Sequence, residues 1–385
     1  MPALRLDRPL AIAMWDFTWL CQHHRGGAFA DWAERLDQLV ERGYNAIRID
    51  CFPHWVAADP EGHHSEEIRI LKRGFGATLW GNQWTVAVNP REALRKFLPM
   101  CRQRGIKVGL STWWSQDTEP SRTERFQGVE QFVRAWDETL AFLDREGLLD
   151  DNILYADLLN EYPLYHGWEW LKRSLATCDE PRLPGRMFNA AQIAHYNAVG
   201  QSAVRQLQAR WPRLPLTICQ TINVPDDCPW RDLDHTGYGL IDRHMWFCID
   251  DDFKRATDYW DTVHRLDNDL GYARTDAAIT TWWREQRGPA TARIDSEIRS
   301  IAEHGRRLGI PVGNTEGWGT IFWMEHPSLS WDFTKETGEV AAQLGAKHGL
   351  AFNCTSNFTH PHFTGIWDDV AWHRRVTGII RGIGA

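Results

Sequence analysis

The sequence predicts an α/β fold in which eight parallel strands, each followed by a helix, close into a (β/α)8 TIM barrel. Short apolar runs alternate with longer amphipathic segments, and this unit recurs eight times along the chain. The length of 385 residues also suits one large barrel that carries insertions. No Ser/Gly-rich linker divides the chain, so we expect a single barrel over residues 1–385.

The first half of the chain supplies four of these units. Strands are predicted at 9–16, 44–52, 106–114 and 152–161, and helices at 29–43, 90–105 and 128–147. The second of these helices has clear boundary signals. Asn89 can cap its start, Pro90 suits its first turn and Gly105 suits its end.

The second half repeats the pattern. Strands are predicted at 214–221, 238–247, 310–319 and 350–358, and helices at 190–211, 293–309, 334–349 and 370–383, with a short helix-like segment at about 225–236. Two longer segments, at about 52–88 and 249–290, follow strands. They are therefore expected to be loop insertions over the C-terminal face of the barrel.

Composition excludes several classes of protein. Hydrophobic residues make up 43% and charged residues 24%, which is ordinary for a globular protein. The net charge of −8 gives no basic surface for nucleic acid. No apolar stretch approaches the roughly 20 residues of a membrane span, and the start of the chain is interpreted as a first strand rather than a signal peptide.

The eight cysteines indicate a reducing environment. They lack the CxxC pairs typical of zinc sites, and several end apolar runs, among them Cys51, Cys219 and Cys354. We interpret them as buried free thiols, which predicts a cytoplasmic protein.

Tryptophan is unusually abundant, with 22 copies. The indole face stacks on the C–H surface of sugar rings while its N–H can hydrogen-bond. Several pairs fall where loops are expected, including Trp113–Trp114 and Trp282–Trp283. This distribution indicates a carbohydrate ligand, although tryptophan also fills cores, and tryptophans in the inserted segments could close a pocket.

Chemistry in such a barrel lies at the C-terminal ends of the strands. Glu161 ends the fourth predicted strand and Glu316 lies in the seventh. These strands are three places apart in a ring of eight, so their ends should face each other. Facing carboxylates, one protonated and one ionised, are what cleavage of a glycosidic bond requires.

The neighbours of the two glutamates suggest their roles. If Arg48 reaches Glu316 from the second strand, its charge should keep that carboxylate ionised for nucleophilic attack. Apolar neighbours of Glu161, among them Leu158 and Leu159, should raise its pKa, as a general acid needs.

Three motifs resemble the large retaining glycoside hydrolase clan that includes the cellulases (clan A). They are LYADLLNEYP at the fourth strand, GIPVGNTEGWG at the seventh and AIRID at the second. The resemblance implies that Glu161 is the acid/base and Glu316 the nucleophile. It further implies that Asn160 binds a sugar hydroxyl, Arg48 holds Glu316 and His244 lines the site.

There are departures from the clan's pattern. Trp246 stands where some members have a tyrosine, two residues after the histidine. The eighth strand, FNCTSNF, has no tryptophan, and Phe358 or a loop tryptophan could substitute. We expect a substrate-binding set that comprises Trp15, Arg48, Asp50, Trp113, Trp114, Asn160, His244, Trp246 and Trp318.

The sequence therefore predicts a retaining glycosidase. It would cleave a β-linked oligosaccharide or small glycoside by a two-glutamate double displacement, with a carbohydrate substrate and without cofactor, metal, nucleic acid or membrane. One alternative is a non-catalytic carbohydrate-binding TIM barrel. Another is a barrel hydrolase that uses metal, which predicts histidines and aspartates at the ends of several strands.

Overall fold

Eight parallel strand positions form the closed barrel. The computed structural model describes residues 2–59, 61–70, 79–82, 84–115, 122–162, 169–176, 178, 181, 188–221, 232–248, 251–263 and 269–383. The barrel strands are β1 (Leu10–Asp16), β2 (Ala46–Asp50), β5 (Lys107–Ser111), β6 (Ile153–Asp157), β7 (Leu216–Thr217) with β8 (Gln220–Thr221), β9 (Ile241–Trp246), β10 (Val312–Asn314) with β11 (Gly317–Trp318), and β12 (Phe352–Cys354).

The strand pairing follows the order of the chain and closes on itself. The sheet runs β11–β9–β10–β12–β1–β2–β5–β6–β7, and β8 pairs with β9. β7 and β8 are the two ends of the strand predicted at 214–221. Because β7 pairs with β6 and β8 pairs with β9, this strand closes the sheet. Every one of these pairings is parallel. The predicted (β/α)8 fold is confirmed.

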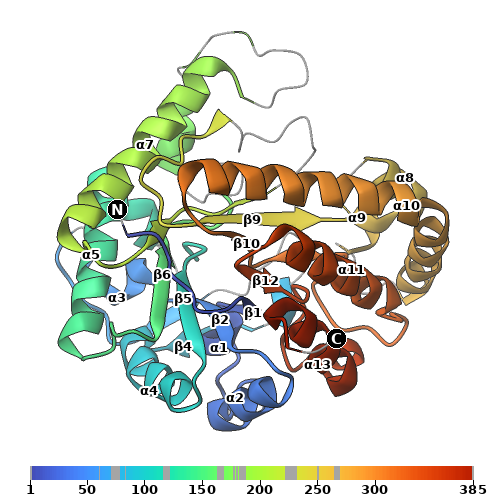
Figure 1. The fold of residues 1–385 in the computed structure, drawn as a ribbon. Coiled ribbons are helices and arrows are strands. Elements are labelled where there is room, and N and C mark those ends of the chain that lie inside the picture. Colours follow the sequence, from blue (N-terminus) through green and yellow to red (C-terminus); the bar gives the residue numbers. More distant parts are fainter. Residues whose placement is uncertain are drawn as a thin grey trace.

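Helices surround the sheet (Figure 1). They are α2 (Trp32–Glu41), α4 (Pro90–Gln103), α5 (Val129–Arg145), α7 (Ala190–Arg210), α10 (Asp269–Leu308), α11 (Asp332–His348) and α13 (Val370–Arg381). Each was predicted at least in part. The capping prediction for α4 is confirmed, because the Asn89 side chain accepts a hydrogen bond of 3.0 Å from the Glu92 amide. The helix-like segment at about 225–236 lies mostly outside the described residues.

Short elements follow several strands on the C-terminal side. They are α1 (Thr18–Cys21) after β1, η2 (Arg122–Arg125) after β5, α6 (Glu169–Leu175) after β6, and α12 (Thr364–Trp367) after β12. The predicted insertion at 52–88 holds α3 (Pro53–Val56), the antiparallel pair β3 (Ile68–Ile70) and β4 (Val86–Val88), and the turn η1 (Leu79–Gly81).

The segment at 249–290 differs from the loop that the sequence suggested. It holds α8 (Asp251–Thr257), α9 (Tyr259–Val263) and the first half of α10. The helix predicted at 293–309 is only the end of α10. Trp282 and Trp283 lie in that helix and pack edge-on against Phe253 and Phe333 respectively. They are core residues and do not close a pocket.

The described cysteines support one part of the sequence interpretation. All seven of the described cysteines lie outside disulfide bonds, and all but Cys178 are buried: Cys21, Cys51, Cys101, Cys178, Cys219, Cys248 and Cys354. Across the part of the chain that the structure describes, no helix combines the length and apolar composition that crossing a membrane requires.

Candidate active site

Glu161 lies just beyond β6, in a turn held by its neighbouring strands. The Asn160 amide donates to Thr112 O on the β5 side, and the Tyr162 amide donates to Cys219 O on the other. Glu161 itself has a left-handed backbone, with φ of 51°. That conformation is uncommon for a residue other than glycine and costs about 1–3 kcal/mol, so surrounding contacts must enforce it.

Glu316 lies between β10 and β11. Its amide donates to the Asn314 side chain at 2.9 Å, which turns the chain after β10. Gly317 follows, and a Cβ there would lie 2.4 Å from Met245 O on β9. Only glycine allows this close approach, so the Glu-Gly pair places the carboxylate beside the end of β9.

Arg48 reaches Glu316 as the sequence analysis expected. Its guanidinium, fully buried on β2, lies 3.2 Å from Glu316 Oε2. It also hydrogen-bonds Asn160 Oδ1 and donates to Ser111 Oγ and Thr315 Oγ1, both at 3.2 Å. One side chain thus ties together residues from both halves of the barrel.

His244 on β9 contacts both glutamates. Its Nδ1 lies 2.9 Å from Glu161 Oε1 and 3.4 Å from Glu316 Oε2. One ligand atom from each of these three side chains lies within 4.8 Å of the other two. The predicted meeting of the two carboxylates is therefore present in the structure. Glu161 and Glu316 are 7% and 3% exposed.

The electrostatics of Glu316 differ from the expectation. Burial raises its pKa to about 8, helped by the charges of Glu161 and Asp16, although His244 and Arg48 act in the opposite direction. Arg48 alone therefore does not keep Glu316 ionised at neutral pH in the free protein. The buried acids of the site outnumber its cations, so a proton on Glu316 relieves their repulsion.

The pKa of His244 lies well above its ordinary value. Burial acts to lower the pKa of His244, but Cys219, Glu316 and a hydrogen bond to Asp242 together raise this pKa by more than burial lowers it. The opposite holds for Asp242: burial acts to raise its pKa, yet contacts with His244, Arg48 and Thr315 hold it below 3.8. These residues form a charged layer beneath the glutamates.

The predicted tryptophans mostly lie elsewhere. Trp15 packs on Phe29 and Phe97 outside the barrel, and Trp114 packs on His54 and Phe132. Trp246 and Trp318 are buried on the paired strands β9 and β11. These four have no face open to a sugar, so their substrate-binding role is not supported. Trp113 alone of the five is partly exposed.

Trp113 is positioned by two aspartates. Its Nε1 donates to Asp16 Oδ2 at 2.6 Å, and its amide donates to Asp50 Oδ2 at 2.8 Å. The other oxygen of Asp50 accepts from the Phe52 amide at 2.7 Å. Asp50 therefore orients the backbone around the site.

Asp16 is a site residue that the sequence analysis missed. It ends β1, is buried, and its Oδ1 lies 3.4 Å from Arg48 Nε. The signal was available, because the rule that selected the other strand-end residues applies equally to the first strand. Trp80 is a tryptophan of the first inserted segment. It packs on Phe358 and His360 after β12, where the sequence suggested a loop tryptophan.

Glu161, His244 and Glu316 have the donor types of a metal site. A histidine must be neutral to bind a metal. Here, the pKa of His244 is raised by its acidic neighbours despite its burial, and the Arg48 guanidinium already lies beside Glu316. The donor set fits a pair of carboxylates balanced by side-chain cations better than a metal centre.

The fold and site define a (β/α)8 barrel with a glutamate pair at its C-terminal face. Residues 12–381 match the sequence profile of a family described as "Cellulase-like: Sugar-binding cellulase-like", and the chain belongs to this family. The resemblance to clan A glycoside hydrolases is thereby confirmed. No curated protein matches the chain.

Solved structures agree with the family. A candidate glycoside hydrolase from Parabacteroides distasonis ATCC 8503 is 28% identical, with a TM-score of 0.81 over 97% of this chain and 94% of its own. A hyperthermophilic endo-β-1,4-glucanase solved with substrate is 10% identical, with a TM-score of 0.53 over 97% and 96%. A family 5 xyloglucanase from Paenibacillus pabuli is 11% identical, with a TM-score of 0.51 over 97% and 98%. The last two share the fold.

Proposed function

We propose that the protein is a retaining glycoside hydrolase that acts on a β-linked oligosaccharide or small glycoside. The observation that carries the proposal is the approach of Glu161 and Glu316 to within 4.8 Å, with His244 in contact with both. Retaining enzymes hold their carboxyl groups about 5–5.5 Å apart, whereas inverting enzymes need roughly 6.5–9.5 Å to admit a water.

In the first step, the ionised Glu316 attacks the anomeric carbon and the glycosidic C–O bond breaks. Glu161 donates its proton to the departing oxygen. In the second step, Glu161 takes a proton from water, and the resulting hydroxide displaces Glu316 from the sugar. Arg48 stabilises Glu316 whenever it carries charge, and Asn160 binds the sugar hydroxyl next to the reacting carbon.

The proton must move before the first step can occur. In the free site it resides on Glu316, whose pKa burial and neighbouring acids raise to about 8. The reaction needs it on Glu161. His244 Nδ1 contacts an oxygen of each carboxylate, so it is placed to pass the proton from one to the other.

The second candidate is a carbohydrate-binding barrel without turnover. Two observations favour it: the family is described as sugar-binding, and both glutamates are almost fully buried. A binding protein has no need for two carboxylates in contact with one histidine, so hydrolysis accounts for more of the site. The candidates differ in whether any aryl glycoside releases its phenol.

The nucleophile is tested with Glu316→Ala and a panel of 2,4-dinitrophenyl β-glycosides. We expect turnover to fall by several orders of magnitude, because no covalent intermediate can form. Azide should then restore part of the rate and give an α-glycosyl azide, which NMR identifies. Glu303→Ala, at an exposed glutamate of α10, is the control and should retain wild-type turnover. Wild-type rates in Glu316→Ala would disprove the assignment.

The acid is tested with Glu161→Ala on glycosides with good and poor leaving groups. A 2,4-dinitrophenolate leaves without protonation, so kcat/KM for it should fall far less than for an alkyl glycoside. An equal loss for both would show that Glu161 does not protonate the leaving group. NMR of the first product anomer formed by the wild-type protein separates retention from inversion.

A further inference from the structure

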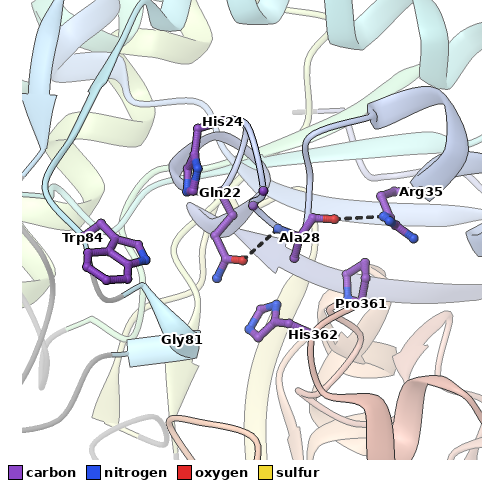
Figure 2. Close-up of a pocket in the computed structure, with 10 residues that line it drawn as sticks. Gln22, His24, Ala28, Arg35, Gly81, Trp84, Pro361 and His362 are labelled. Carbon is purple, nitrogen blue, oxygen red and sulfur yellow. Dashed lines mark hydrogen bonds between the residues drawn. The ribbon is translucent and has the colours of Figure 1, made fainter.

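A cavity of about 310 Å³ opens on the C-terminal side of the barrel, and its lining does not include Glu161 or Glu316. Its walls come from the segments that follow β1, β2 and β12. Figure 2 shows Trp84 and Arg35 at opposite ends of the view, with Gln22 and His362 between them. The volume lies at the lower end of the range for ligand pockets.

The walls of the cavity are held in place by local contacts. The Gly27 amide donates to His24 O, and a Cβ on Gly27 would lie 2.2 Å from Gln22 O. On the opposite wall, a Cβ on Gly81 would lie 2.8 Å from His362 Nε2. Glycine therefore allows both walls to fold tightly, and a ligand would meet a preformed site.

Trp84 supplies an exposed aromatic face. It is 66% exposed, whereas the tryptophans predicted around the glutamates are buried, apart from the partly exposed Trp113. An indole left in solvent beside a polar cavity is suited to stack on the C–H face of a sugar ring. The cavity is lined by no carboxylate among the described residues, which argues against a cation as its ligand.

His362 supplies a hydrogen-bond acceptor. Its Nε2 lies 2.9 Å from Trp80 O, and since a carbonyl only accepts, Nε2 carries the hydrogen. Burial lowers the pKa of His362 to about 4, so the ring is neutral and Nδ1 has a lone pair. Nδ1 has no hydrogen-bond partner among the described residues. Because this atom is buried, the ring must turn slightly for a sugar hydroxyl in the cavity to satisfy it.

Arg35 and Gln22, which also line the cavity, are already paired. Arg35 donates to Ala28 O at 2.8 Å and lies 3.3 Å from Glu34, so its charge is largely balanced. The side-chain amide of Gln22 donates to Trp80 O and accepts from the Ala28 amide, and both of these hydrogen bonds are long, at 3.3 Å. This lining fits a neutral polyhydroxylated ligand better than an anion.

Trp80 joins the cavity to the mouth of the barrel. Its carbonyl accepts from Gln22 and His362 at the cavity, while its ring packs on Phe358 and Trp323. Trp323 follows Glu316 by a single short segment after β11. A ligand in the cavity would therefore lie on the same face of the barrel as the glutamates, and Trp80 and Trp323 connect its wall to the segment after β11.

We propose that this cavity is a saccharide subsite, in which Trp84 stacks on one pyranose ring of an oligosaccharide and Gln22 and His362 bind its hydroxyls. The proposal rests on the proposed function in one respect: the bound ring belongs to the substrate whose scissile bond lies between Glu161 and Glu316. The substrate class is then an oligosaccharide long enough to reach both places.

The test measures binding, so that it does not depend on turnover. Isothermal titration of Glu316→Gln protein with β-1,4-linked tetrasaccharides of glucose, mannose and xylose identifies one that binds. Adding Trp84→Ala should weaken its affinity about three- to tenfold, the value of one aromatic contact. Trp260→Ala removes a tryptophan that is 47% exposed and does not line the cavity, and it should leave the affinity unchanged.

A second variant addresses the cavity itself. Ala28→Phe fills it from the wall and should weaken the same tetrasaccharide, while thermal unfolding verifies that the variant is folded. Unchanged affinity in both Trp84→Ala and Ala28→Phe would overturn the subsite, as would failure of all three tetrasaccharides to bind. Binding that depends on Trp84 without turnover of any aryl glycoside would support the subsite and reject hydrolysis.

Discussion

Arg48 is the buried cation that balances the acidic side chains of the site. Burial acts to lower its pKa, but Asp16, Cys219, Glu316 and Asp157 hold that pKa well above its ordinary value. A guanidinium out of water is tolerated only when acids and acceptors surround it. Arg48 has such partners around its guanidinium. It therefore contributes both to the site and to the stability of the fold.

Arg48→Ala should therefore destabilise the fold. It removes the cation beside the buried Asp16 and Asp157, and removing one partner of a buried ion pair costs about 3–5 kcal/mol. Urea unfolding at pH 7 measures the free energy of unfolding. Arg374→Ala breaks an exposed pair with Glu41 and should cost about 1 kcal/mol or less. Equal losses in the two variants would contradict the role assigned to Arg48.

Glu316 gives a prediction about pH. Its pKa, about 8 in the folded protein against 4.5 ordinarily, means that the folded state holds its proton more tightly than the unfolded state. Its contribution to stability is therefore complete below pH 4.5 and is lost as pH rises through 8. Glu316→Gln removes this loss, so the variant should gain stability over the wild type by roughly 3–5 kcal/mol between pH 4.5 and 8.

The measurement is the free energy of unfolding of both proteins at pH 4.5, 6 and 8. Glu303→Gln, at an exposed position, should show no such trend. A difference between Glu316→Gln and wild type that stays constant with pH would show that the carboxyl titrates normally in the fold.

At the level of single residues, strand-end logic predicted that Arg48, Glu161 and Glu316 would meet, whereas only the resemblance to clan A added Asn160 and His244 to them. It could not predict the tryptophans, because an indole at a strand end faces either the barrel axis or the helices, and side-chain direction depends on local twist. Trp15 and Trp114 face helices and are core. The protonation of Glu316 could not be predicted either, because it depends on how many buried acids share the site.

The helix α4 offers a test at the level of one element. Its cap, Asn89, accepts from the Glu92 amide. Asn89→Ala removes this bond and should lower the free energy of unfolding by about 1 kcal/mol, while Asn89→Asp keeps an acceptor and should be nearly neutral. Urea unfolding measures both. If the alanine and aspartate variants are equally stable, the cap contributes nothing.

Most elements could be predicted from periodicity, but α10 could not be predicted in full. It spans 40 residues and passes through Pro289. Proline usually ends a helix because it lacks a donor and clashes with the preceding turn. The tertiary contacts of α10 outweigh that preference: Ile294, Ile298 and Ile301 are fully buried. Local signals carry no information about such packing.

At the level of the whole molecule, the barrel was predictable because its repeat is built into the order of strands and helices. Closure is different, since it requires β1 to pair with β12 from the far end of the chain. Register there follows from the buried faces of both strands, as in Leu10 with Phe352. The cavity beside Trp84 lies among the segments that follow the strands.

The Arg48 guanidinium lies on β2, in the first half of the polypeptide. The two halves therefore differ in whether their buried acids keep this cation. Cutting the backbone at the exposed turn at 212–213 would give an amino-terminal fragment that keeps Arg48 with Asp16 and Asp157. The carboxy-terminal fragment would keep Asp242 and Glu316 but lose that counter-ion. We expect the carboxy-terminal fragment to be insoluble when expressed alone and soluble when co-expressed with the amino-terminal fragment. The carboxy-terminal half would therefore fold only on an amino-terminal half that is already present.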